Sequence, residues 1–371
     1  MAMDTAPEAL AQEKFACPAC GGDAHWNPAK QALVCPFCGT SAPIEGDPTL
    51  GGVVEHDLVR ALREVPDVAR GWQDDKVSVK CQSCQAISVF DRARQAQRCD
   101  FCGSAQLLPY EQTKAAFRPE SMLPFKISEA QAREAIRAWY GKVWFAPNAL
   151  KNKALTDTVK GIYLPYWTFD AQADARWRAE AGYYYYTTEE STNSRGESSV
   201  RRVQHVRWEP AAGELSHFFD DDLVCASVGV QTDLLRGVEP FPTKNGLIPY
   251  DPKFVAGWVV ERYQIDLISA AQHAREVMEG KLRELCRAQV PGDTCRNLEV
   301  QSRFTRQTFK HILAPAWLVT YQYGTRSFQV VQNGVTGKIA GHYPKSWIKI
   351  TLAVVAVLVV VFVIFAMGGG R

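Results

Sequence analysis

The stretch Ala29–Thr40, AKQALVCPFCGT, recurs at Ala93–Ser104 as ARQAQRCDFCGS, with seven of twelve positions identical at an offset of 64 residues. Each copy completes a set of four cysteines, in which two Cys-x-x-Cys pairs are separated by fourteen residues. Four thiolates at tetrahedral corners are the ligand set that Zn²⁺ prefers. The sequence therefore predicts two structural zinc ions, with the ligands Cys17, Cys20, Cys35, Cys38, Cys81, Cys84, Cys99 and Cys102.

The spacing alone leaves open which pairs share an ion. Local closure spans fourteen residues, whereas joining Cys20 to Cys81 spans 60, and the difference in loop entropy is only about 1.3 kcal/mol per site. The repeat favours two self-contained zinc ribbons, each with a short hairpin between its pairs. The N-terminal MAMDTAPEALAQEK carries acids and no apolar core, so it is not typical of a signal peptide. Without export the thiols stay reduced, which favours zinc over disulfides or a redox motif.

Four thiolates leave no coordination position for a catalytic water, so both sites are predicted to be structural. Gly39 and Gly103 follow the last ligands, where a tight turn often needs positive φ. A second hypothesis is nucleic-acid contact through the second ribbon, although a solvated basic face is the commoner explanation. The basic residues that suggest it are Lys76, Lys80, Arg92, Arg94 and Arg98.

The C-terminal end has no charged residue from Ile350 to Gly370. Ile350–Met367 would be a helix of roughly 27 Å, close to the ~30 Å apolar layer of a bilayer. Aromatic and basic residues precede this run, and only Arg371 follows it. These features predict a single-pass tail anchor at 350–367 in a bacterial inner membrane, with the N-terminal bulk in the cytoplasm. The competing interpretation is a buried core segment.

The middle of the chain reads as an α+β domain rich in antiparallel strands with two packing helices. Ser128 and Gln131 form a capping-box signature for one helix. Leu267 to Ala288 predicts the other, and Asn333-Gly334 indicates a hairpin. The expected units are a first ribbon (1–46), a helical linker (47–75), a second ribbon (76–108), a helical connector (109–157), an aromatic β-rich domain (158–344) and a transmembrane anchor (345–371).

We find no motif for an enzymatic reaction, whether a phosphate-binding loop, H-E-x-x-H or G-x-S-x-G. A net charge of +2 predicts no overall positive surface potential that would attract nucleic acid. His205, His217 and His311 lie in strand-like aromatic surroundings, where structural histidines are commoner than catalytic ones. Asp220–Asp222 could hold a cation, but a solvated turn is the default.

Four long segments and the doubled cysteine set resemble a widespread family of uncharacterised bacterial zinc-ribbon membrane proteins, often labelled as primosomal protein N′ or replication-helicase homologues. The segments are RPESMLPFKISEAQAREAIRAWYGKVWFAP (118–147), GIYLPYWTFDA (161–171), HVRWEPAAGELSHFFDD (205–221) and HILAPAWLVTYQYGTRSFQVVQNGVTGKIAG (311–341). The resemblance implies structural zinc, cytoplasmic exposure and no catalytic residues, and it suggests phage-shock or band-7 type proteins as partners. The helicase label does not fit, because motor motifs are absent. Gln85 departs from the family pattern, in which a glycine often follows the second ligand.

These observations together predict a membrane-anchored, non-enzymatic adaptor that binds protein partners. The alternative is a membrane-tethered nucleic-acid-binding protein. A third hypothesis, an enzyme, requires His205, His217 and Asp220 to meet in one pocket.

Overall fold

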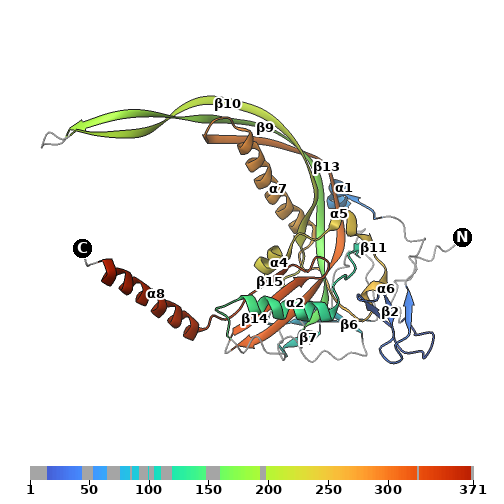
Figure 1. The fold of residues 1–371 in the computed structure, drawn as a ribbon. Helices are drawn as coiled ribbons and strands as arrows, with labels where there is room; N and C mark the ends of the chain where they lie inside the picture. Colours follow the sequence, from blue (N-terminus) through green and yellow to red (C-terminus); the bar gives the residue numbers. More distant parts are fainter. Residues whose placement is uncertain are drawn as a thin grey trace.

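The computed structural model describes residues 15–43, 53–64, 76–83, 86–91, 99, 104–109, 119–147, 159–192, 198–323 and 326–368. Strands dominate these residues and form two sheets, one of three strands and one built around a path of eight strands with others attached beside it (Figure 1). The smaller sheet contains β1 (His25–Asn27), β2 (Ala32–Val34) and β3 (Ser41–Pro43).

The larger sheet follows the order β11-β8-β13-β9-β12-β6-β5-β7 and also includes β4, β10, β14 and β15. Its strands are β4 (His56–Asp57), β5 (Lys76–Cys81), β6 (Ile87–Asp91), β7 (Leu107–Pro109), β8 (Ser121–Met122), β9 (Lys160–Thr192), β10 (Ser198–Cys225), β11 (Ile248–Pro249), β12 (Val259–Glu261), β13 (Thr294–Tyr323), β14 (Arg326–Asn333) and β15 (Ile339–Gly341). The helices are α1 (Leu58–Glu64), α2 (Glu129–Lys142), α4 (Thr232–Val238), α5 (Thr243–Gly246), α6 (Pro252–Val255), α7 (Leu267–Gln289) and α8 (Trp347–Gly368).

The three longest strands, β9, β10 and β13, pair antiparallel with β9 in the centre, and they curl around α7 (Figure 1). Along β9 every second side chain is buried from Phe169 to Ala181, whereas the intervening residues are polar. This period of two places one face against the helix. Most buried residues on that face are alanines, which let α7 approach closely.

The helix α7 begins where the sequence predicts, with the Asp266 carboxylate accepting a hydrogen bond from the Ser269 amide at 2.8 Å. Its buried residues repeat every four positions, as Ala270, Ala274, Met278, Leu282 and Cys286. Leu282 lies on this buried face, whereas the apolar side chains of Val277 and Leu285 are 39% and 37% exposed. The packed face therefore combines two alanines and a cysteine with Met278 and Leu282.

Two local signals are confirmed. The capping box is present at the start of α2, where the Ser128 and Gln131 side chains each receive a hydrogen bond from the other's backbone amide. The Asn333 carboxamide accepts hydrogen bonds from the amides of Val335 and Thr336, both at 2.9 Å, in the turn that joins β14 to β15. Both signals depend only on neighbouring residues, so the surrounding fold does not alter them.

The two predicted ribbons have different settings. The first is a separate sheet, β1-β2-β3, whereas the strands of the second, β5, β6 and β7, belong to the larger sheet. Strand β6 pairs with β12, where Val260 lies opposite Val89, and β12 pairs with β9. The two predicted ribbons are therefore not equivalent in their strand pairing, because the first forms a sheet of its own and the second does not.

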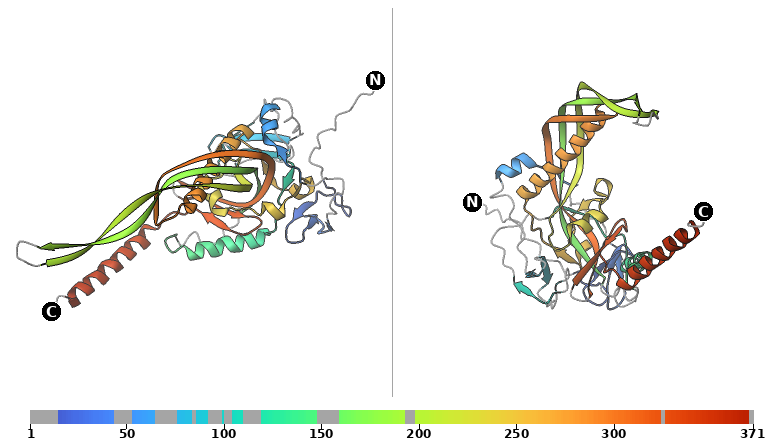
Figure 2. Two further views of the ribbon diagram at one scale, coloured as in Figure 1. Left: turned by 90° about the horizontal axis from the view of Figure 1, so that it is seen from above. Right: turned by 90° about the vertical axis from the view of Figure 1, so that its left-hand side faces the viewer.

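At the C-terminal end, α8 leads away from the sheet (Figure 2). Among the described residues, we find no helix that combines the length and the apolar character needed to cross a membrane. On this finding the predicted transmembrane helix at 350–367, the tail anchor and the single-pass location in the inner membrane are wrong.

Candidate metal centre

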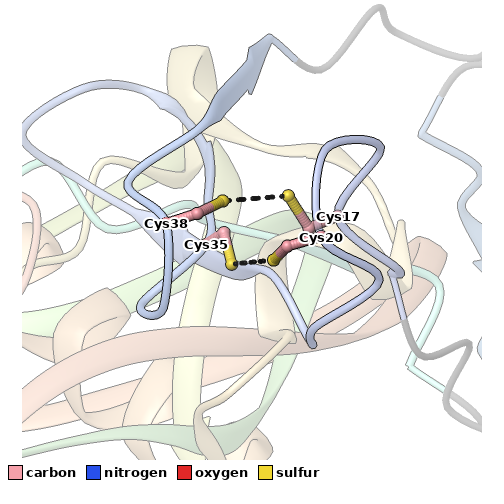
Figure 3. Close-up of side chains that lie close together, drawn as sticks. All are labelled: Cys17, Cys20, Cys35 and Cys38. Carbon is pink, nitrogen blue, oxygen red and sulfur yellow. Dashed lines mark hydrogen bonds between the residues drawn. The ribbon is translucent and has the colours of Figure 1, made fainter.

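The thiols of Cys17, Cys20, Cys35 and Cys38 converge at one end of the first ribbon (Figure 3). Their sulfur atoms all lie within 4.8 Å of one another, and two of the distances, Cys17 to Cys38 and Cys20 to Cys35, are 3.5 Å. A Zn–S bond of about 2.3 Å places the sulfurs of a tetrahedral site about 3.8 Å apart. The four thiols could therefore bind one metal ion without rearrangement, as the sequence predicts.

Each Cys-x-x-Cys turn in this ribbon is closed by two backbone hydrogen bonds. The Cys17 amide donates to Gly22 at 2.7 Å, and the Gly21 amide donates back to the Cys17 carbonyl at 2.8 Å. Cys35 repeats this pattern with Thr40 at 2.9 Å and Gly39 at 3.0 Å. Gly21 and Gly39 have φ of +73° and +74°, so only glycine takes these positions without strain. The positive φ expected at Gly39 is confirmed.

The proton affinities of these thiols differ. Hydrogen bonds from the Thr40 hydroxyl and amide, together with neighbouring thiols, lower the pKa of Cys38 to about 6. The Gly22 amide acts to lower the pKa of Cys20, but hydrogen bonding to Cys38 and Cys35 raises it to about 12. One thiolate therefore forms easily, while its neighbour keeps its proton. A divalent cation removes this conflict, because coordination displaces the remaining thiol protons. The donor set thus fits a soft metal ion.

Two of the four cysteines of the second set, Cys81 and Cys99, lie within the described residues, and both are buried. Cys84, Cys102 and Gly103 lie outside them. The Cys81 amide donates to Ala86 at 2.9 Å, and the Cys99 amide donates to Ser104 at 2.7 Å. In both cases the acceptor is five residues beyond the cysteine, as it is for Cys17 and Cys35. One of the two backbone bonds that close the turns at Cys17 and Cys35 is therefore also present at Cys81 and Cys99.

A buried carboxyl group, Glu261 on β12, borders this second set. Its Oε1 atom accepts a hydrogen bond from the Gln264 side chain at 2.7 Å, and its side chain is fully buried. Burial raises the pKa of Glu261 to about 8, and the nearby Cys99 thiol acts in the same direction. The carboxyl therefore carries a proton in the folded protein at neutral pH.

We predict that this group makes the protein less stable as pH rises. Because the pKa is raised on folding, the unfolded chain releases the proton above its ordinary pKa of 4.5 while the folded chain retains it. The free energy of unfolding should thus fall between about pH 4.5 and pH 8 and then level off. Glu261→Gln keeps the shape and removes the titration, so denaturant melts of this variant should show a flatter pH profile. An unchanged slope would show that Glu261 is ionised in the folded state.

The residues of the nucleic-acid hypothesis are only partly described. Lys76 and Lys80 lie on β5, and Lys80 is half-buried. Arg92, Arg94 and Arg98 lie outside the described residues. Contact between the second ribbon and nucleic acid therefore stays a prediction.

The aspartate run contains a buried ion-pair cluster that sequence reasoning missed. Asp221 sits in a bulge of β10 with φ of +56°. Its carboxylate lies 2.8 Å from the ammonium of Lys310 on β13, a side chain that is only 6% exposed. The same ammonium lies 3.1 Å from Glu55 and 3.9 Å from Asp170. Asp170, Asp220 and Asp221 are close enough together to suggest a cation site, but the lysine already supplies the positive charge.

Lysines also neutralise the two outer aspartates of this run. Lys244 contacts Asp220 at 2.7 Å, and Lys281 on α7 pairs with Asp222. A solvated turn is therefore the wrong description for Asp221, since its side chain is 5% exposed. The only signal in the sequence is the run itself, because each lysine comes from a distant segment.

The histidines named in the enzyme hypothesis do not meet. His205 and His217 both lie on β10, twelve residues apart, which is about 40 Å along a strand. His205 stacks on Tyr185 with ring centroids 5.2 Å apart, and His311 is buried beside Trp167 at 4.7 Å. These contacts are structural, and they do not assemble the pocket that an enzyme of this kind requires.

Fold and site together define a strand-rich protein with a cluster of four cysteines near its N-terminal end that could bind a metal ion. The chain is similar to the uncharacterized protein YdjG of Bacillus subtilis (strain 168), with 24% identity over 362 residues that cover 96% of this chain and 98% of that protein. No protein-family model matches the chain, and no solved structure matches it. The similarity extends over nearly the whole length of both proteins and carries no activity with it.

Proposed function

We propose that the protein is a non-enzymatic, zinc-binding adaptor, in which two Cys₄ zinc ions are structural and the β-domain binds protein partners. The observation that carries the zinc assignment is the convergence of four thiols on turns whose backbone closure recurs at Cys81 and Cys99. Four thiolates complete the coordination shell of zinc, which leaves no position for substrate or water. A structural role follows from that closed shell.

The test of this assignment is the metal content of the purified full-length chain. We expect two equivalents of zinc per chain by elemental analysis, released by a thiol-modifying reagent. Serine replacement of Cys38 should remove one equivalent, and replacement of Cys295, a cysteine outside both sets, should remove none. One equivalent in the unmodified chain would restrict the proposal to the first ribbon, and none would end it.

The surface that supports an adaptor role is a hairpin arm, which we define as Tyr183–Thr192 of β9 and Ser198–Arg207 of β10. It continues beyond the last residue pair that β13 makes with β9, Thr294 with Gly182, and it projects from the body (Figure 2). Tyr184, Tyr185 and Tyr186 are 42–50% exposed along it. Tyrosine and arginine are enriched at protein interfaces because they combine apolar area with hydrogen bonding.

The two faces of the arm differ in what they present. Tyr184 and Tyr186 share one face, on which the Arg202 guanidinium lies 4.0 Å from the Tyr186 ring centroid. Tyr185 is on the other face, stacked on His205. An arginine held over an exposed ring keeps both groups ordered in the unbound state, which lowers the entropy cost of binding.

We predict that Tyr184→Thr combined with Tyr186→Thr reduces capture of crosslinked partners at least tenfold, as expected from the loss of one hot-spot pair. Threonine suits a strand, so the arm should stay folded. The matched control is Tyr185→Thr on the opposite face, which should retain capture. The measurement is quantitative mass spectrometry of crosslinked complexes from cells that express each full-length variant. Equal capture by all variants would exclude the arm as the docking surface.

A further inference from the structure

The first ribbon, residues 15–43, lies against the segment that joins α6 to β12. The Trp26 side chain is 4% exposed, and its ring packs edge-on against Phe254 with centroids 4.7 Å apart. The Trp26 amide donates a hydrogen bond to the Ala256 carbonyl at 3.2 Å. A second polar contact joins the Gln31 side chain to the Phe125 carbonyl at 3.3 Å. Backbone and side-chain contacts therefore both cross this boundary, which we call the ribbon–body contact.

The small core of the ribbon is completed by the body. Its buried cluster contains Ala24, Trp26 and Leu33 from the ribbon and Ala256 from the body. So few apolar residues cannot hold a fold by burial alone, and a metal ion is the usual substitute for a core. Trp26 pairs with Leu33, two residues before Cys35, so loss of a metal ion from the four thiols should also disturb Trp26.

The body is shaped to receive the ribbon. Gly257 has φ of +81°, and a Cβ atom at this position would lie 2.6 Å from Cγ of His25. Beyond it, Trp258 stacks on Phe125 at 4.6 Å and meets Trp317 edge-on at 5.3 Å. The aromatic residues under the ribbon therefore belong to a continuous cluster that extends into the larger sheet.

We propose that metal binding at Cys17, Cys20, Cys35 and Cys38 is coupled to the ribbon–body contact, so that the metal determines whether the aromatic surface of Phe254 and Trp258 is covered. This inference rests on zinc binding by the first ribbon in the proposed function. Coupling of this kind is reciprocal: if zinc favours docking by a given factor, docking favours zinc binding by the same factor.

The experiment compares hydrogen exchange in the full-length protein and in Cys38→Ser, which removes the first metal and leaves the second set of cysteines intact. The reporter is the segment 252–258, in which the Trp258 amide donates to Val255 at 3.1 Å and the Ala256 amide donates to Lys253 at 3.4 Å. We expect exchange there to accelerate roughly tenfold or more once the first ribbon no longer packs on this segment. Exchange in the paired segments of β9 and β13 should stay unchanged, which shows that the body remains folded.

A second variant alters the body side of the ribbon–body contact. Ala256→Arg puts a long charged side chain at a position that is 9% exposed under the ribbon, while all eight predicted zinc ligands remain. We expect it to weaken zinc affinity at the first site, measured by competition with a chromogenic chelator, by the same factor by which Cys38→Ser accelerates exchange. Ala288→Arg, at an exposed position in the last turn of α7, is the matched control and should alter neither quantity.

The outcomes separate this inference from the proposed function. Unchanged exchange at 252–258 in Cys38→Ser would overturn the coupling while leaving zinc binding intact. Normal zinc affinity in Ala256→Arg, with accelerated exchange at the reporter, would overturn it as well. Absence of zinc from the unmodified protein would instead remove the proposed function on which the inference rests.

Discussion

Cys35→Ser is expected to unfold the first ribbon alone, whereas Cys81→Ser should destabilise the whole β-domain. Both cysteines are buried, and each variant loses one predicted zinc ligand. The two variants should differ because the strands next to each cysteine are paired differently. Strands β1, β2 and β3 pair only with one another, whereas β5 pairs with β6, and β6 leads through β12 to the central strand β9. A zinc ion of the second set therefore supports a strand ladder that continues into the main sheet.

The expected magnitudes follow from zinc as a source of folding energy, about 10–16 kcal/mol per structural site at neutral pH. In Cys35→Ser that loss falls on residues 15–43 and on the segment 252–258 that they cover, so the melting temperature of the β-domain should stay within a few degrees of the original. In Cys81→Ser the melting temperature should drop clearly. Differential scanning calorimetry together with hydrogen exchange resolves the two patterns. Equal melting temperatures for both variants would contradict a stabilising link between the second set of cysteines and the main sheet.

Lys310→Met is expected to destabilise the protein by about 3–5 kcal/mol, the usual consequence of removing one partner from a buried ion pair. Burial acts to lower the pKa of Lys310, but the carboxylates of Asp221, Glu55 and Asp170 raise it above its ordinary value. Without the ammonium, two buried carboxylates face each other without a counter-charge. Burial already raises the pKa of Asp170, so the variant should take up protons on folding.

Denaturant melts measure this change, and pH provides a second test. Lowering the pH should recover part of the lost stability, because burial raises the pKa of Asp170 and a protonated carboxyl tolerates burial. Lys244→Met is the matched control: this lysine contacts Asp220 in the same bulge but is 62% exposed, so its loss should have little effect. A small effect of Lys310→Met at neutral pH would show that water reaches the cluster.

Among the predictions from sequence, the strongest are those that depend on a few neighbouring residues. The Cys-x-x-Cys turns close through bonds to the fifth residue, and Gly39 takes the positive φ expected of it. The Ser128 capping box and the Asn333 turn are equally local.

The predictions that fail required knowledge of distant partners. Hydropathy alone predicted a membrane anchor at 350–367, and among the described residues no helix meets the requirements for a span. The buried ion pair of Asp221 could not be predicted from the sequence, because its counter-charge, Lys310, is 89 residues further along the chain.

The sequence by itself determined the local backbone structure of the cysteine turns, because each turn is closed within six consecutive residues. It also determined where α2 and α7 begin, through side chains that cap their own backbone. Only the tertiary structure decided that the first ribbon rests on Ala256, that the second merges with the main sheet and that Lys310 neutralises a buried acidic bulge. The physical reason is that strand pairing and charge burial join residues far apart in the chain, and their free energy depends on neighbours that no local pattern specifies.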